Sequence, residues 1–259
     1  MRVGEGITLR IADHSPGGFI WVNGTLNLNG GTLHNDKTGL ITNRGTINVN
    51  GATLNNQGFT LVNESEGRIN NVGGLISNGA RFTNLGTLVN DKDSTFLHGD
   101  GATLTNSGSL INAGIFYTSD RAGDVTNRQG GTLVNSGTLN QGGVGIFSVL
   151  AGARITNSGR INMLASLFDN RGVIENTGTL ELFHFASFQN LNGQLENQAG
   201  GTFLNSGSVS NFSGSTINNA GSIINNRSLL NVGTINNMCG GTVTGAVSGN
   251  QPVNTCTES

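Results

Sequence analysis

Hydrophobic and polar positions alternate along this chain in short units that repeat with few interruptions. A unit consists of glycine, a small polar residue, an aliphatic residue, a variable residue and asparagine. Clear examples are GTLHN (31–35), GLITN (39–43), GTLVN (86–90), GSLIN (108–112), GTLVN (131–135) and GTINN (233–237). This alternation predicts that each unit forms one β-strand of roughly three to five residues with one buried face.

A longer period lies above the short unit. GGTL at Gly30 returns as GATL at Gly51 and as GGLI at Gly73, and GGTL at Gly130 returns as GARI at Gly152. Three short units therefore make one period of about 21–22 residues, which is typical of solenoid architectures. Glycine suits the sharp turns, while asparagine tolerates left-handed backbone and bonds local backbone groups, so each unit boundary is predicted to be a corner.

We therefore predict an all-β fold, a right-handed parallel β-helix (β-solenoid) with three short strands per coil. Stacked coils lie about 4.8 Å apart, so inward aliphatic side chains form columns, and corner asparagines can bond up and down the stack. In segment 51–72 the inward residues are Leu54, Leu61 and Ile69. From Gly24 to Met238 there is room for roughly ten coils, or a rod about 50 Å long.

Two other folds fit less well. An antiparallel sandwich would show hairpin turns at longer spacing, and glycine and asparagine interrupt every window in which a helical period could be tested. The repeat loosens at 90–101, 116–126 and 142–151, which we expect to bulge out as loops. The stretch LELFHFASF (180–188) is either a more deeply packed coil or an exposed aromatic patch for a partner.

The chain divides into three parts. Residues 23–238 carry the solenoid repeats, whereas 1–22 and 239–259 depart from them. The first part holds Phe19 and the single tryptophan, Trp21. Because open solenoid ends expose unpaired strand edges, each terminal part is expected to be either a cap or an assembly segment that docks onto another subunit.

Cys239 and Cys256 are the only cysteines. With no histidine nearby and no CxxC, a disulfide is favoured over a metal site, and it would indicate an oxidising compartment. The alternative is two unpaired thiols in a frayed tail.

Composition narrows the class of protein. The chain has 42 glycines, 2 prolines, 11% charged residues and a formal net charge of -2. Recurring aliphatic residues argue against disorder, and the lack of a basic run argues against nucleic acid. No apolar stretch is long enough to span a membrane. The first residues lack the apolar core of a secretory signal, so we expect a mature product or excised segment, although a cytoplasmic origin would explain this equally well.

No catalytic constellation is found, so we expect neither an enzyme nor a cofactor. The acidic residues are scattered, although Asp91 with Asp93, or Asp120 with Asp124, offers ligands of the type that calcium prefers. The four histidines (His14, His34, His98 and His184) are far apart. Asn-x-Ser/Thr sequons at Asn23, Asn63, Asn211 and Asn226 are attributed to chance in so asparagine-rich a chain.

The GxLxN-type repeat over about 24–238 resembles the β-solenoid repeats of secreted bacterial surface proteins, namely filamentous haemagglutinin-like exoproteins and autotransporter passengers. The resemblance implies an extracellular or cell-surface location. The leading hypothesis is a homopolymer, formed by end-to-end or lateral association into a fibre, sheath or surface layer. An adhesin or stalk that binds host or surface glycans is the alternative. Ice binding and polysaccharide cleavage rank below both.

Overall fold

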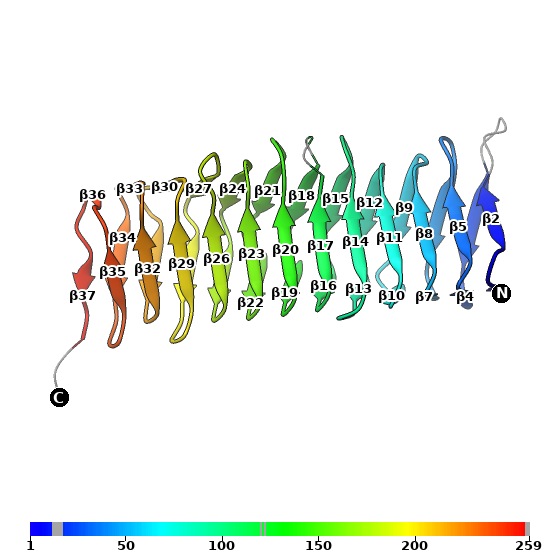
Figure 1. Cartoon of the computed structure of the whole chain (residues 1–259), viewed down its shortest axis with the longest axis horizontal. Coiled ribbons are helices and arrows are strands. Elements are labelled where there is room, and N and C mark those ends of the chain that lie inside the picture. Colours follow the sequence, from blue (N-terminus) through cyan, green and yellow to red (C-terminus); the bar gives the residue numbers. More distant parts are fainter. Residues whose placement is uncertain (12–17, 120, 122, 257–259) are drawn as a thin grey trace.

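The computed structural model describes residues 1–11, 18–119, 121 and 123–256. In this part of the chain the secondary structure consists of 37 short strands, and every strand pairing is parallel. The strands form three sheets that run along one rod, with the N-terminus at one end and the C-terminus at the other (Figure 1). Each strand pairs with the third strand that follows it, so three consecutive strands make one coil.

The three sheets are named here A, B and C in the order in which the chain visits them. Sheet A contains β1 (Arg2–Val3), β4 (Thr25–Asn29), β7 (Thr46–Asn50), β10 (Arg68–Val72), β13 (Thr87–Asn90), β16 (Ser109–Asn112), β19 (Thr132–Asn135), β22 (Arg154–Asn157), β25 (Val173–Asn176), β28 (Gln194–Asn197), β31 (Thr216–Asn219), β34 (Thr234–Asn237) and β37 (Val253–Asn254). Sheet B contains β2 (Thr8–Ile11), β5 (Thr32–Asn35), β8 (Thr53–Asn56), β11 (Leu75–Asn78), β14 (Thr95–His98), β17 (Ile115–Thr118), β20 (Thr138–Gln141), β23 (Arg160–Met163), β26 (Thr179–Leu182), β29 (Thr202–Asn205), β32 (Ser222–Asn225) and β35 (Thr242–Thr244). Sheet C contains β3 (Phe19–Val22), β6 (Leu40–Asn43), β9 (Thr60–Asn63), β12 (Arg81–Asn84), β15 (Thr103–Asn106), β18 (Asp124–Asn127), β21 (Ile146–Val149), β24 (Leu167–Asn170), β27 (Ser187–Asn190), β30 (Ser208–Asn211), β33 (Ser228–Asn231) and β36 (Ser248–Gly249).

The predicted fold class, a parallel β-solenoid with three strands per coil, is confirmed. Thr25, Thr46 and Arg68 occupy equivalent positions in successive coils of sheet A, which reproduces the period read from the sequence. Sheet A is 13 strands deep, so the rod is about 58 Å long at the usual strand spacing. Strands β1 to β3 and β35 to β37 continue the three sheets into both terminal parts of the chain.

The interior is filled by the second residue of each four-residue strand. Leu54, Leu61 and Ile69, one from each sheet, are fully buried. In sheet C the column contains phenylalanines from consecutive coils, and the rings of Phe168 and Phe188 meet edge to face with centroids 5.3 Å apart. Burying each such side chain stabilises the fold by roughly 1.5–3 kcal/mol, so the core is a narrow line of strongly stabilising contacts.

The fourth residue of most strands is a buried asparagine that bonds the next coil. Asn112, for example, donates from Nδ2 to Oδ1 of Asn135 at 2.7 Å and to the carbonyl oxygen of Thr138 at 3.1 Å. The same pattern forms an unbroken ladder along one edge of sheet A. Its members are Asn71, Asn90, Asn112, Asn135, Asn157, Asn176, Asn197, Asn219, Asn237 and Asn254. The predicted bonding between stacked corner asparagines is therefore confirmed.

The first ladder of each sheet begins with an asparagine whose side-chain oxygen is unsatisfied. The side-chain oxygens of Asn35, Asn43 and Asn71 are buried without a hydrogen-bond partner among the described residues. The equivalent positions in the coil before them hold Ile11, Val22 and Val49, which carry no donor. An asparagine ladder thus has a direction, because its amide groups all donate towards the C-terminal end of the rod.

The corner asparagines do not adopt the left-handed backbone expected of them. Among the described non-glycine residues only Asn192 has a positive φ, at 56°. Glycine supplies the tight geometry instead: a Cβ on Gly108 would lie 2.2 Å from the carbonyl oxygen of Gly86 in the preceding coil. Asparagine is used at the corners for its side-chain amide and glycine for its small size.

The three loosened stretches are largely regular. Strand β14 lies within 90–101, β17 and β18 extend into 116–126, and β21 lies within 142–151. The expected bulges at 90–101 and 142–151 are therefore wrong, because both stretches contain a complete strand. The cause is the corner residue, since β14 ends in His98 and β21 in Val149, and neither matches the asparagine of the repeat.

Candidate functional site

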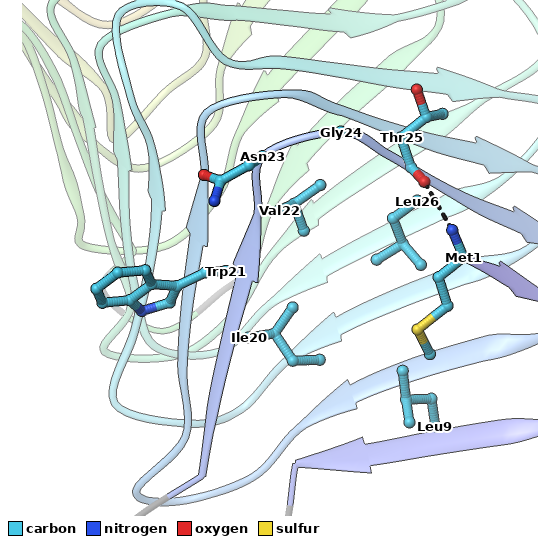
Figure 2. Close-up of a pocket in the computed structure, with 9 residues that line it drawn as sticks. All are labelled: Met1, Leu9, Ile20, Trp21, Val22, Asn23, Gly24, Thr25 and Leu26. Carbon is cyan, nitrogen blue, oxygen red and sulfur yellow. Dashed lines mark hydrogen bonds between the residues drawn. The ribbon is translucent and has the colours of Figure 1, made fainter.

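Among the described residues, no strand covers the apolar interior at the N-terminal end of the rod. A cavity of about 390 Å³ at this end is lined by Met1, Leu9, Ile20, Val22 and Leu26, among others. Figure 2 shows these aliphatic side chains gathered beside one another between the ends of the first strands. The free edges of β1, β2 and β3 pair with no other strand in the described chain, so backbone groups and apolar side chains are exposed together.

Phe19 and Trp21 belong to the other face of the same strand. Side chains alternate along β3, so Ile20 and Val22 face the interior, whereas Trp21 extends to the opposite side (Figure 2). Phe19 and Trp21 are 63% and 70% exposed. They therefore lie on the outer surface of sheet C beside the open end, and whether they act as a cap or in assembly stays a prediction.

The C-terminal end is closed covalently. Cys239 and Cys256 form the predicted disulfide, with their Cα atoms 4.8 Å apart. Strands β35, β36 and β37 all lie between the two cysteines, so the bond ties down the last coil. Val243 and Val247 in this coil pack against the core and remain partly buried. Both ends of the chain thus leave core aliphatic side chains incompletely covered.

The stretch 180–188 contains both packed core residues and exposed aromatic residues, and a partner for the latter stays a prediction. Leu180, Leu182 and Phe188 are completely buried in the core. Phe183 and Phe185, in the turn between β26 and β27, are 38% and 78% exposed. The ring of Phe185 contacts that of His184 edge to face, at 4.7 Å between centroids.

His98 replaces a ladder asparagine, and among the described residues it is the one titratable group with a large pKa shift. It is fully buried, and burial lowers its pKa from 6.5 to about 4. Its Nδ1 lies 3.0 Å from Nδ2 of Asn78, and its Nε2 lies 3.1 Å from the carbonyl oxygen of Asp124. This arrangement requires a neutral ring that accepts at Nδ1 and donates from Nε2, which is a structural role.

The aspartate pairs proposed as calcium ligands and the glycosylation sequons were compared with the structure. No group of three or more histidine, cysteine, aspartate or glutamate side chains within the described ranges could hold a metal ion. Asp91 accepts from the backbone amide of Lys92, whereas Asp120 lies outside the described residues. Two sequon asparagines, Asn63 and Asn211, are buried ladder members and so are inaccessible in the folded chain. Across the described residues no helix is long and apolar enough to cross a membrane.

Comparisons with known proteins place the chain in no family. No protein-family model matches it, and no curated protein matches it. A search of solved structures matches the crystal structure of a TibA fragment hyper-glycosylated by TibC, with 17% identity and a TM-score of 0.36. That match covers 96% of this chain and 95% of the fragment. At this similarity it supports no statement about function.

Proposed function

We propose that this protein is a non-catalytic structural component of the cell exterior that assembles end to end through its solenoid. The open N-terminal end supports this proposal most directly, because unpaired strand edges and an apolar cavity of about 390 Å³ meet there. Exposed strand edges are sites of pairing with another chain. The disulfide at the other end favours an oxidising, extracellular compartment.

A second copy is the occupant that fits this end. The three parallel strands of one chain's last coil have the same direction and cross-section as the coil that would precede β1. Docking them would bury the partly covered Leu9 and Ile20 of one copy and Val243 and Val247 of the other in the same interface. Such a head-to-tail contact is heterologous, so it repeats and builds a filament rather than a closed dimer.

The number of strands determines how two copies would meet. The described residues form 12 complete coils and one further strand, β37. At each end, the three terminal strands are staggered along the rod axis, each by a third of a coil, and form a helical ramp. The ramps match when β1, β2 and β3 of one copy lie on β35, β36 and β37 of the other. Successive copies are then rotated by one side of the triangular coil, about a third of a turn, with an axial repeat of about 59 Å.

Electron microscopy of the oxidised full chain tests the assembly directly. We expect filaments with the stated repeat at high protein concentration. Particles that stay monomeric, or that stop at a dimer with two N-terminal ends in contact, would contradict the proposal.

Cysteine pairs test the register between copies. Ser248 of β36 and Arg10 of β2 hold equivalent outward positions that become neighbours in the rotated arrangement, whereas Ser248 and Trp21 become neighbours without rotation. Neighbouring strands bring Cα atoms within disulfide range. The double variant Ser248→Cys/Arg10→Cys should therefore form covalent oligomers on a non-reducing gel, and Ser248→Cys/Trp21→Cys should not.

A further inference from the structure

The outward side chains of sheet C form a row that differs from those of the other two sheets. In the N-terminal half this row is Trp21, Thr42, Val62, Thr83, Thr105 and Thr126, one residue per coil. The row spans about 24 Å at the strand spacing. It lies away from the rod's interior and, apart from Trp21, away from the open end.

Polar side chains in the equivalent rows of sheets A and B bond one another. Asn48 donates to Asn27 and Asn70 donates to Asn48 on sheet A, while Asn162 donates to Asn140 on sheet B. No hydrogen bond is found within the described chain for the hydroxyl groups of Thr42, Thr83, Thr105 or Thr126. The surface of sheet C therefore keeps hydrogen-bonding capacity that sheets A and B use internally.

Two arginines beside the threonine row are unpaired, whereas arginines on other parts of the rod are paired. Arg154 on sheet A bonds Glu175 of the next coil, and Arg160 on sheet B bonds Glu181 at 3.1 Å. Arg81 and Arg128 border the threonine row and are exposed, and neither guanidinium has an ion-pair partner in the described part of the chain.

These two arginines line one shallow cavity. It has a volume of about 380 Å³, and its other walls are Thr83, Thr103, Thr105 and Thr126, with Asp124 and Leu104. Asp124 contributes the single carboxylate, and its Oδ1 accepts from the backbone amide of Ile146 at 2.9 Å. The cavity thus presents two unpaired guanidinium groups and a run of free hydroxyl groups.

We propose that this part of sheet C binds an acidic polysaccharide lying along the rod axis, with its carboxylate or sulfate groups on Arg81 and Arg128. Guanidinium groups bind such oxyanions through paired hydrogen bonds, and threonine hydroxyls both donate to and accept from sugar hydroxyls. The overall net charge of -2 disfavours diffuse attraction of a polyanion, so binding has to come from a local site. The proposal does not depend on end-to-end assembly.

Isothermal titration of the oxidised full chain with polygalacturonate, dextran sulfate and neutral dextran at physiological salt tests this. Binding of one or both acidic polymers, with dextran inert, is the expected result, and the preferred polymer identifies the acid group. The double variant Arg81→Gln/Arg128→Gln should bind roughly tenfold more weakly or worse, because it removes two charge-assisted contacts.

The matched control is Arg154→Gln/Arg160→Gln. It removes the same charge from exposed ion pairs on sheets A and B, where little stability is at stake. Its affinity should stay within about twofold of the wild type, and circular dichroism should show both double variants folded. The proposal is overturned if no acidic polymer binds, if dextran binds equally well, or if the control loses as much affinity as the Arg81/Arg128 variant.

Discussion

Acidification should destabilise the rod through His98. The ring is buried and neutral, its Nδ1 facing the Asn78 amide and its Nε2 donating to the carbonyl of Asp124. A proton on Nδ1 would therefore meet a donor rather than an acceptor. Burial is the main reason why the pKa of His98 falls from 6.5 to about 4. Below pH 6.5 the unfolded chain binds a proton that the folded chain does not. The free energy of unfolding therefore decreases as the pH is lowered.

The size of the effect follows from the pKa difference. Between about pH 6.5 and pH 4 the loss approaches roughly 3 kcal/mol, at 1.36 kcal/mol for each pH unit. Urea unfolding of the wild type and of His98→Asn at several pH values measures it. In most other coils the residue equivalent to Asn78 faces an asparagine, and the substitution places asparagine at position 98 as well. It leaves the remaining titratable groups unchanged. The idea fails if both proteins lose the same stability between pH 7 and pH 4.

Three further changes probe the ladder, the disulfide and the core. Asn112→Leu should cost about 2–3 kcal/mol in urea unfolding, because it leaves the buried Asn135 oxygen without its donor. Reducing the Cys239–Cys256 bond should lower the unfolding free energy of the last coil by about 3 kcal/mol, seen as faster hydrogen exchange in β35 to β37 alone; faster exchange throughout the rod would contradict this. In urea unfolding, Phe168→Ala should cost about 3–5 kcal/mol. The exposed Phe185→Ala should cost less than about 0.5 kcal/mol in the same measurement.

Sequence reasoning recovered the coil because the repeat is itself the structural unit. Glycine, a polar residue, an aliphatic residue and asparagine occupy fixed positions, so their spacing carries the period, the inward columns and the ladders. It failed where a different residue solves the same physical problem. His98 fills the ladder position and bonds Asn78, yet it was not recognised as a corner because the repeat pattern was defined by asparagine.

The candidate binding surface could not be predicted from the sequence. Arg81 and Arg128 are separated by two coils, and in the sequence they look no different from Arg154 or Arg160. Their distinction is the absence of a carboxylate at the neighbouring outward position, which depends on the register between strands. Residue types alone do not show which arginines are paired.

Most positions of each strand are required for the fold, so binding should depend on the few side chains that point outward. In a four-residue strand such as β15, Leu104 is committed to the core and Asn106 to the ladder, while the turn glycine before the next strand is fixed by contact with the preceding coil. Only the outward positions, Thr103 and Thr105, are free to change without disturbing these contacts. We therefore expect Thr105→Ser to leave stability within about 0.5 kcal/mol of the wild type, whereas Leu104→Ala should cost about 2–5 kcal/mol. Comparable losses at both positions in urea unfolding would show that the outward row is part of the scaffold.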